Sequence, residues 1–356
     1  MKNMNKTRFA AAFTAVVLSL GVLSGCQGGE GAKTSSTADT ASSSTESTAN
    51  TESTASTETD SDKVYNIGIC QLVQHEALDA ATKGFTDKLT ELLGKDKVKI
   101  DLQNAQGDSP TCATICNQFV ANKSDLILAN ATPALQAAVA ATGDIPILGT
   151  SVTDYATALE IKDFSGTTGR NISGTSDLAP LDKQAEMLTE LFPEAKTVGI
   201  LYCSAEANSK YQYDTIAPMF TESGLTVKEY TFSDSNDISQ VTTTACSECD
   251  VLYIPTDNQA ASNVELINNI ALPAKTPIVA GEENICKGCG VATLSISYYD
   301  LGVKTGEMAY DILKNGKDVK SMEIAYAPAT TKKYMKDRAQ QLGVTIPDGY
   351  EEIVAE

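Results

Sequence analysis

The chain has 356 residues, 46 of them Asp or Glu against 27 Lys or Arg, and its formal net charge is −19. Such acidity argues against a nucleic acid as a partner, because phosphate binding needs clustered basic residues. The sequence contains one histidine, which excludes zinc sites built from several histidines. Its 42% of apolar residues suffices for a packed core, and its length fits about two domains.

Residues 1–25 have the pattern of a secretory signal peptide, with three basic residues before an apolar run over residues 9–22. A short membrane anchor is the alternative, but about 14 apolar residues fall short of the roughly 20 that span a bilayer. Residues 23–26, Leu-Ser-Gly-Cys, resemble the lipobox of bacterial lipoproteins. That resemblance implies cleavage before Cys26 and lipidation of its thiol. We therefore expect an extracytoplasmic protein that is lipid-anchored to the cell membrane.

Residues 26–62 are expected to comprise the lipidated cysteine and a disordered tether. Of the 36 residues in 27–62, 18 are Ser or Thr, and none is aromatic or a branched aliphatic. Such a segment cannot bury enough apolar area to offset its ordering entropy. It is typical of a solubilising spacer.

From residue 63 onward, short apolar runs alternate with segments of helical spacing. The first series predicts strands at 63–70, 98–102, 125–129 and 145–148, with helices at 75–93, 112–120 and 133–140. The second series predicts strands at 197–202, 225–232, 250–255, 277–280 and 291–296, with helices at 183–191, 210–222, 238–245, 259–270 and 301–313. This alternation is typical of parallel sheets covered on both faces, and it predicts two similar α/β lobes. Ligands in such sheets bind beyond the carboxyl ends of the strands, here in the cleft between the lobes.

The sequence carries none of the usual catalytic signatures. We find no phosphate-binding GxxxxGK[ST] loop, no GxSxG elbow, no HExxH and no GxGxxG after a strand. His75, the one histidine, starts a predicted helix, where capping, packing or ligand contact is more common than catalysis. We therefore expect no enzyme activity and no cofactor.

Two cysteine pairs need separate consideration. Cys246 and Cys249, and likewise Cys286 and Cys289, have the spacing of half-sites for zinc. The first pair precedes a predicted strand and the second follows one, so the length of a sheet should separate them. We expect no joint metal site; local disulfides and free thiols both remain compatible with the sequence.

Eight short motifs follow the predicted strands. They span residues 71–79 (QLVQHEALD), 104–108 (NAQGD), 131–134 (ATPA), 151–154 (SVTD), 171–177 (NISGTSD), 206–209 (EANS), 255–258 (PTDN) and 281–283 (GEE). In this order they resemble the ABC-transporter substrate-binding lipoprotein family that includes tryptophan-uptake binding proteins, over about residues 64–348. The turn that holds Cys286 and Cys289 departs from the family pattern.

The resemblance implies a type I periplasmic-binding-protein fold, with two Rossmann-like lobes of parallel sheets joined by a three-stranded hinge. We expect an N-terminal lobe at 63–173 plus about 296–320, and a C-terminal lobe at 174–295 plus about 321–356. The resemblance also implies a hydrophobic or aromatic L-amino acid as ligand, and an ABC permease with its ATPase subunit as partners. A monomer is expected.

The expected ligand contacts lie in these motifs: Gln71, His75, Glu76, Ala131, Thr132, Ser151, Thr153, Asp154, Tyr202, Asp257, Asn258 and Glu283. Thr132 and Ser151 would hold the ligand carboxylate, helped by free N–H groups at a helix start. By analogy with related amino-acid-binding folds, Asp257 would accept from the ammonium, with Glu283 and Asp154 as second choices. Thr132 and Asp257 are equally compatible with helix N-caps. Three tyrosines are candidates for a ring-contacting wall, although core positions are more common: Tyr155, Tyr202 and Tyr298.

Three other functions are compatible with parts of this pattern. The chain could report ligand binding to a signalling receptor, could be a secreted enzyme, or could bind a nucleoside or sugar. The sequence offers no catalytic constellation for the second, and the lack of tryptophan disfavours a sugar site.

Overall fold

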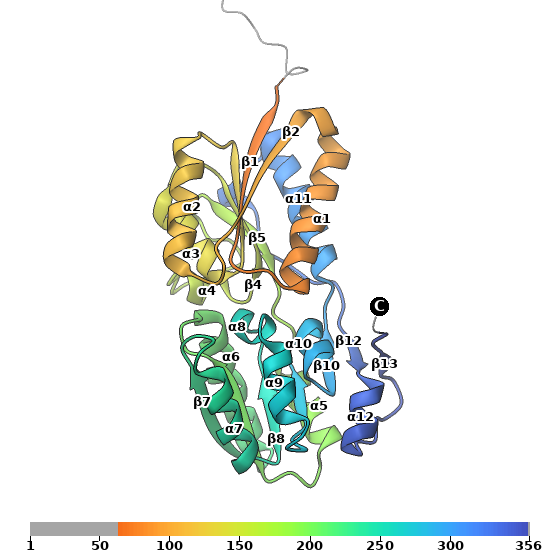
Figure 1. Cartoon of the computed structure of the whole chain (residues 1–356). Coiled ribbons are helices and arrows are strands. Elements are labelled where there is room, and N and C mark those ends of the chain that lie inside the picture. The colour runs from red at the N-terminus through yellow and green to blue at the C-terminus, as the bar shows by residue number, and fades with distance from the viewer. Residues whose placement is uncertain (1–62, 355–356) are drawn as a thin grey trace, which may run out of the picture. The chain divides into compact units, whose positions relative to one another are not determined.

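The computed structural model describes residues 63–354, which form two α/β lobes around separate sheets (Figure 1). The sheet of the first lobe contains, in spatial order, β11 (Ala325–Tyr326), β5 (Ile172–Ser176), β4 (Ile147–Val152), β3 (Leu126–Asn130), β1 (Tyr65–Gln71) and β2 (Val98–Asn104). The sheet of the second lobe contains β13 (Glu351–Glu352), β12 (Thr331–Tyr334), β10 (Ala292–Ser295), β9 (Ile278–Ala280), β8 (Val251–Ile254), β6 (Thr197–Cys203) and β7 (Thr226–Phe232).

The strands pair in parallel except for β10 and β12, which are antiparallel. The expected α/β fold with two parallel-sheet lobes is confirmed, with this one antiparallel pair added near the C-terminus. The predicted signal peptide, Cys26 and the tether lie outside the described residues. Within 63–354, every helix is too short or too polar to cross a membrane.

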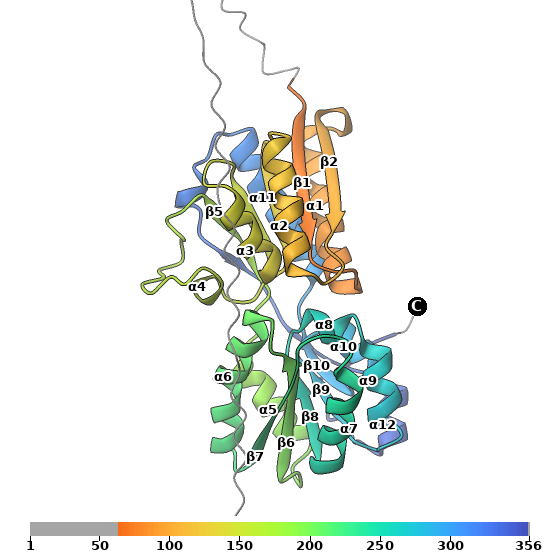
Figure 2. The ribbon, with the colours of Figure 1, turned by 60° about the vertical axis from the view of Figure 1, so that its left-hand side comes forward.

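Helices cover both faces of the first sheet, as its buried strands require. β3 and β4 are buried along their whole length, which explains their continuous apolar runs. One face packs against α2 (Ser109–Ala121) and α3 (Thr132–Ala141), seen together in Figure 2, and the other against α1 (Glu76–Leu93) and α11 (Tyr298–Leu313). A Cβ on Gly302 would lie 2.0 Å from the Ala81 carbonyl oxygen, so glycine allows α1 and α11 to approach closely.

The second sheet is sandwiched in the same way. α5 (Leu181–Leu191) and α6 (Ala207–Glu222) pack on one face. The other face packs against α7 (Ile238–Glu248), α8 (Asn258–Ala261), α9 (Val264–Ala271) and α10 (Glu283–Gly288). The remaining helices are the short α4 (Tyr155–Ala158), which follows β4, and α12 (Lys336–Leu342), which follows β12.

Several elements differ from the sequence prediction; α4, α12 and the short strands β11, β12 and β13 were not predicted, and three further differences bear on the site. β5 was not predicted, because its sequence ISGTS is mostly polar; its hydroxyls bond inside the lobe, as Ser173 does to the Met322 carbonyl. The helix predicted at 259–270 is two helices, α8 and α9, interrupted at Ser262 and Asn263. α10 was also missed, since its six residues are too few to show periodicity.

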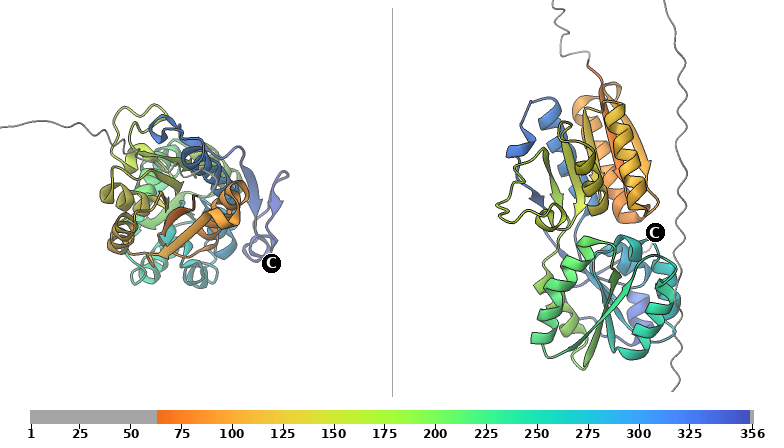
Figure 3. Two further views of the ribbon diagram at one scale, coloured as in Figure 1. Left: turned by 90° about the horizontal axis from the view of Figure 1, so that it is seen from above. Right: turned by 90° about the vertical axis from the view of Figure 1, so that its left-hand side faces the viewer.

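The chain crosses between the lobes three times, after β5, after β10 and after β11. The right-hand view of Figure 3 shows these segments together at one side of the lobes. They match the three connections expected of the hinge. The lobe boundaries stay a prediction, but β5 extends past the expected boundary at 173, and β11 lies in the first sheet although it follows residue 320.

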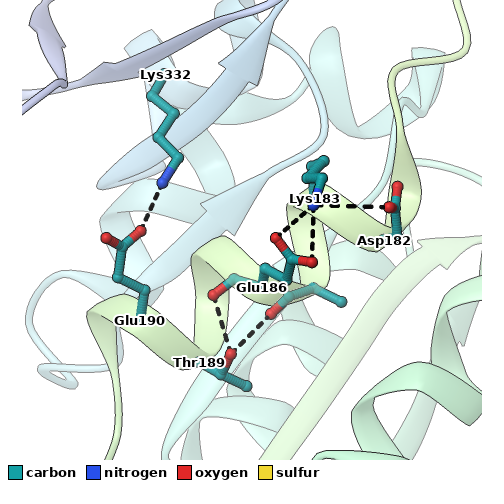
Figure 4. Close-up of polar contacts among 7 residues, drawn as sticks. Asp182, Lys183, Glu186, Thr189, Glu190 and Lys332 are labelled. Carbon is teal, nitrogen blue, oxygen red and sulfur yellow. Dashed lines mark hydrogen bonds and ion pairs between the residues drawn. The ribbon is translucent and has the colours of Figure 1, made fainter.

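The C-terminal segment is fastened to the second lobe by side chains. Lys332 of β12 donates to Glu190 of α5 over 2.6 Å, as Figure 4 shows, and Tyr350 donates to the same carboxylate over 3.0 Å. Arg338 of α12 donates to four carbonyl oxygens at and beyond the end of α10, those of Cys286, Lys287, Gly288 and Gly290. These contacts hold the segment after the third crossing on the second lobe.

Candidate functional site

The candidate site lies at the carboxyl edge of the first sheet, where β5, β4, β3 and β1 end side by side. At or after the end of each strand, one polar side chain has a buried atom without a hydrogen-bond partner among the described residues; three of these side chains are buried and that of His75 is half-buried. These atoms are Oδ1 of Asp177, Oγ of Ser151, Oγ1 of Thr132 and Nδ1 of His75. Buried polar atoms in folded proteins are nearly always hydrogen-bonded, so this concentration at one sheet edge indicates a place for a polar ligand.

Thr132 and Ser151 lie beside strained backbone. Ala131, the N-cap of α3, has φ 97°, and Ser151 has φ 54°, a region that favours glycine. The Ala131 N–H donates to the Thr150 carbonyl over 3.0 Å, which joins the ends of β3 and β4. Thr132 and Ser151 are only 2% and 5% exposed. Strain of this kind persists where the surrounding structure imposes it, and it is concentrated at ligand sites.

Asp177, directly after β5, is the acid of this edge. Its Oδ2 accepts from the Tyr298 hydroxyl over 2.9 Å, and its Oδ1 has no hydrogen-bond partner among the described residues. Burial raises the pKa of Asp177 to about 6. The free Oδ1 and the raised pKa both indicate a carboxylate that a cation would stabilise.

Three buried acids follow strands of the second lobe, and donors of their own lobe, mainly N–H groups at helix starts, engage all of them. Both oxygens of Asp257 are used: Oδ1 accepts from the Ala260 N–H, and Oδ2 from the Cys203 N–H and the Ser209 hydroxyl, each over 2.7 Å. Glu206 accepts from the N–H groups of Asn258 and Gln259.

Glu282 accepts from the N–H groups of Asn284 and Ile285 at 2.7 and 2.6 Å. Burial raises the pKa of Glu282 to about 7, and burial together with Asp257 raises that of Glu206 to about 7. In the turns that carry these acids, one buried side-chain atom has no hydrogen-bond partner among the described residues: Oδ1 of Asn208, at the start of α6.

Polar contacts join the two lobes across the cleft. His75 Nε2 lies 3.3 Å from Asn258 Oδ1, and Gln259 Nε2 donates to the Gly107 carbonyl over 3.1 Å. Lys287 of α10 pairs with Glu76 of α1 over 2.7 Å. The lobes are therefore closed on each other in this structure.

A cavity of about 410 Å³ lies beside the hinge, between α1, α10 and the second and third crossing segments. Glu76 and Glu283 line it, together with Glu282 and Tyr298. Two of its acids are paired with lysines: Glu76 with Lys287, and Glu283 with Lys333 over 2.8 Å, while Glu283 also accepts from Ser295 over 2.6 Å. Burial opposes ionisation of Glu283, yet these two bonds outweigh it and lower its pKa.

The expected contact residues divide into distinct groups in the structure. Thr132, Ser151 and His75 have unmet atoms, and Ala131 shapes the same edge. Asp154 caps α4 through the Thr157 N–H, and the Gln71 side chain is occupied by Val73, Asp79 and Thr82 within the first lobe. The assignment of ligand contacts stays a prediction, but these bonds leave Asp154 and Gln71 with structural roles.

Of the three tyrosines, only Tyr298 touches the site, through Asp177. Tyr202 lies in the core of the second lobe, stacked on Tyr213 with ring centroids 5.4 Å apart. The Tyr155 hydroxyl donates to the Thr175 carbonyl inside the first lobe. Side chains alternate between the two faces of a strand, and that of Tyr202 lies on the face covered by α5 and α6, away from the sheet edge.

The eight described cysteines are free thiols. Cys246 and Cys249 lie at the end of α7, on the amino side of β8, whereas Cys286 and Cys289 lie at α10, after β9. In the described part of the chain, no group of three or more His, Cys, Asp or Glu side chains is arranged to hold a metal ion. The buried cysteines pack in the hydrophobic cores of the two lobes.

Four polar residues were absent from the sequence-based site: Asp177, Glu206, Asn208 and Glu282. Each belongs to a motif that follows a strand, so its position was visible in the sequence. What the sequence does not show is which oxygen of each side chain remains free after folding. Asp177 ends the motif at residues 171–177, but the sequence-based site does not include it.

The chain belongs to the ABC transporter substrate-binding protein family, whose model matches residues 66–354. Members of this family bind solutes for transporters, so the expectation of a non-enzymatic protein is confirmed. A curated relative, the tyrosine-binding protein of Clostridioides difficile (strain R20291), is 39% identical over 85% of this chain and 83% of its own length.

Two solved structures that resemble this one differ in their bound state. An ABC domain from Streptococcus pneumoniae in complex with L-Trp is 34% identical, covers 82% of this chain and 100% of its own, and gives a TM-score of 0.77. The ligand-free, open structure of a Clostridium difficile substrate-binding protein with adhesive properties is 39% identical over 82% and 100%, with a TM-score of 0.62. The more similar sequence gives the lower score, which agrees with the closed lobes seen here.

Proposed function

We propose that this protein binds an aromatic L-amino acid between its lobes and presents it to the permease of an ABC importer. The observation that carries the proposal is the set of unmet polar atoms along one sheet edge, with hydroxyls at β3 and β4 and a carboxylate at β5. The relatives described as tyrosine-binding and as complexed with L-Trp support the choice of side chain.

The α-carboxylate of the ligand would lie at the start of α3. Free N–H groups and the positive end of the helix dipole favour an anion there. Oγ1 of Thr132 and Oγ of Ser151 are unmet donors on adjoining turns. Together they offer the carboxylate more than one hydrogen bond.

The ammonium group would lie against Asp177 Oδ1, which replaces Asp257 as the candidate acceptor. Both oxygens of Asp257 are engaged by N–H and hydroxyl donors, whereas Asp177 keeps one oxygen unmet. Glu282 contributes negative charge nearby: burial raises the pKa of its carboxyl most, and Glu283 and Asp177 add smaller increases. A cation between these acids would favour their ionised forms.

A thermal-shift and titration panel tests this proposal. L-Tyr or L-Trp should raise the melting temperature and bind the purified protein, because a ligand selective for the folded state stabilises it. Tyramine lacks the carboxylate, and 3-(4-hydroxyphenyl)propionate lacks the ammonium; each should bind at least about 10-fold more weakly than L-Tyr. If no aromatic amino acid binds, or if either analogue binds as well as L-Tyr, the proposal is wrong.

We also propose that the protein works as a monomer outside the cytoplasm, held to the membrane by lipid on Cys26 after removal of residues 1–25. The basic, apolar and lipobox-like segments of the sequence support this. Cys26→Ala should release the protein from the membrane fraction. Retention of that variant at normal expression would contradict lipid anchoring.

A further inference from the structure

His75 is the one histidine of the sequence and lies where the lobes meet. It precedes α1 as its N-cap residue, and its side chain makes no capping bond to that helix. Its ring instead reaches the second lobe, with Nε2 3.3 Å from Asn258 Oδ1. The side chain as a whole is half-buried, but Nδ1 has no access to solvent and no partner among the described residues.

The surrounding bonds determine which ring nitrogen of His75 carries the proton. Asn258 Nδ2 donates to the Glu206 carboxylate over 2.6 Å, which turns the amide oxygen of Asn258 toward His75. Glu206 itself is fixed by N–H donors from Asn258 and Gln259. An amide oxygen only accepts, so Nε2 of the ring must be the donor.

A neutral imidazole with its proton on Nε2 exposes a lone pair on Nδ1. Burial lowers the pKa of His75 to about 4, so the ring is neutral at pH 7. Nδ1 is then a buried acceptor that needs a donor, just as Asp177 Oδ1 does. The α-ammonium and α-carboxylate of the ligand are directed to Asp177 and to Thr132, which leaves the ligand side chain to supply the donor for His75.

We propose that Nδ1 of His75 accepts a hydrogen bond from the ligand side chain, and that the site thereby selects aromatic amino acids with a ring donor. The phenol O–H of tyrosine and the indole N–H of tryptophan both satisfy this requirement, and phenylalanine does not. This inference rests on the proposed function, because it presupposes an aromatic amino acid in the cleft. Binding phenylalanine would leave a buried acceptor unmet.

The test compares affinities of the full, untagged protein for L-Tyr, L-Trp and L-Phe. Wild type should bind L-Tyr or L-Trp at least about 10-fold more tightly than L-Phe. In His75→Leu this preference should collapse to within about 2-fold. The variant removes no capping bond, and circular dichroism checks that it folds.

Gln259→Ala is the matched control. It removes another contact between the lobes, the bond to the Gly107 carbonyl, without altering His75. It should weaken all three ligands by a similar factor and keep the preference for a ring donor. A preference that survives in His75→Leu, or that disappears in Gln259→Ala, would overturn the inference. Failure of wild type to bind any aromatic amino acid would instead overturn the proposed function.

Because the chain has a single histidine, ¹⁵N-histidine labelling gives a spectrum of His75 alone. At pH 7 we expect the proton on Nε2 and an unprotonated Nδ1, whose resonance shifts when L-Tyr binds and shifts much less with L-Phe. A proton found on Nδ1, or equal shifts with both ligands, would contradict the assigned acceptor.

Discussion

The two edges that face each other across the cleft are built from similar polar residues but differ in how those residues are satisfied. At the first lobe, Thr132, Ser151 and Asp177 each keep an unmet atom, and the backbone is strained at Ala131 and Ser151. At the second lobe, Glu206, Asp257 and Glu282 are engaged by N–H and hydroxyl donors of their own lobe.

This difference assigns the two lobes different tasks: the first binds the ligand and the second closes over it. Unmet atoms and strain on the first lobe are suited to capturing the charged groups of a ligand, because those groups replace missing partners. The satisfied acids of the second lobe fix the turns that carry Asn258 and Gln259, which then contact the first lobe. We therefore expect the ligand to bind the first lobe before the second closes over it by hinge motion.

The largest expected effect distinguishes two aspartates that each follow a strand. Asp177→Asn should weaken binding of L-Tyr roughly 10- to 150-fold, the range for losing a hydrogen bond to a charged group of about 1.5–3 kcal/mol. Asp257→Asn should leave affinity within about 3-fold but lower the free energy of unfolding by about 1–3 kcal/mol, since buried donors lose their acceptor. Calorimetric titration and denaturant unfolding of both variants measure this. Reversed results would mean that the second lobe holds the ammonium.

A smaller effect is expected from pH. Burial raises the pKa of Asp177 to about 6, and pairing with the ligand ammonium requires its ionised form. Affinity for L-Tyr should therefore fall about 10-fold between pH 7.5 and pH 5, with proton release on binding at the lower pH. Titrations in buffers of different ionisation enthalpy measure both quantities. Equal affinity at the two pH values would contradict the role of Asp177.

The ligand-free protein should show the opposite trend in stability. A carboxyl whose folded pKa is raised makes the folded state bind more protons than the unfolded state. For Asp177, Glu206 and Glu282 the window runs from about 4, the unfolded value, to about 6 or 7. Their joint contribution to the free energy of unfolding should decline as pH rises through this window.

The smallest effect concerns the strain of the first edge. Ala131→Gly should raise the free energy of unfolding by about 1 kcal/mol, because glycine relieves the positive φ at a modest entropic cost. Ala207→Gly, at the first residue of α6 in the second lobe, is the control and should lower it by about 0.5–1 kcal/mol. Chemical denaturation compares the two. A loss of stability in both variants would contradict the claim that the backbone at Ala131 is strained.

The sequence predicted the fold where apolar periodicity was strong. The buried strands β1, β3, β6 and β8 and the long helix α1 follow directly from their apolar runs. β5 could not be recognised, since Ser173 and Thr175 are buried through hydrogen bonds to Met322, which precedes β11, and to Thr305 of α11.

The sequence predicted where the site residues lie along the chain, but not which of their side-chain atoms stay free for a ligand. Thr132 and Ser151 were identified because both follow strands and carry donors. Asp177 and Asp257 also follow strands, and only the folded structure shows that Ser209 and the Cys203 N–H engage Asp257. The positive φ of Ala131 has no signal in the sequence either, because alanine does not favour that conformation.

A crystal structure of the protein with L-Tyr tests the central claim most directly. We predict the ligand carboxylate within hydrogen-bond distance of Thr132 Oγ1 and Ser151 Oγ, and its ammonium against Asp177 Oδ1. A ligand bound in the reverse orientation, with its ammonium on the second lobe, or one bound in the cavity beside the hinge, would contradict the account.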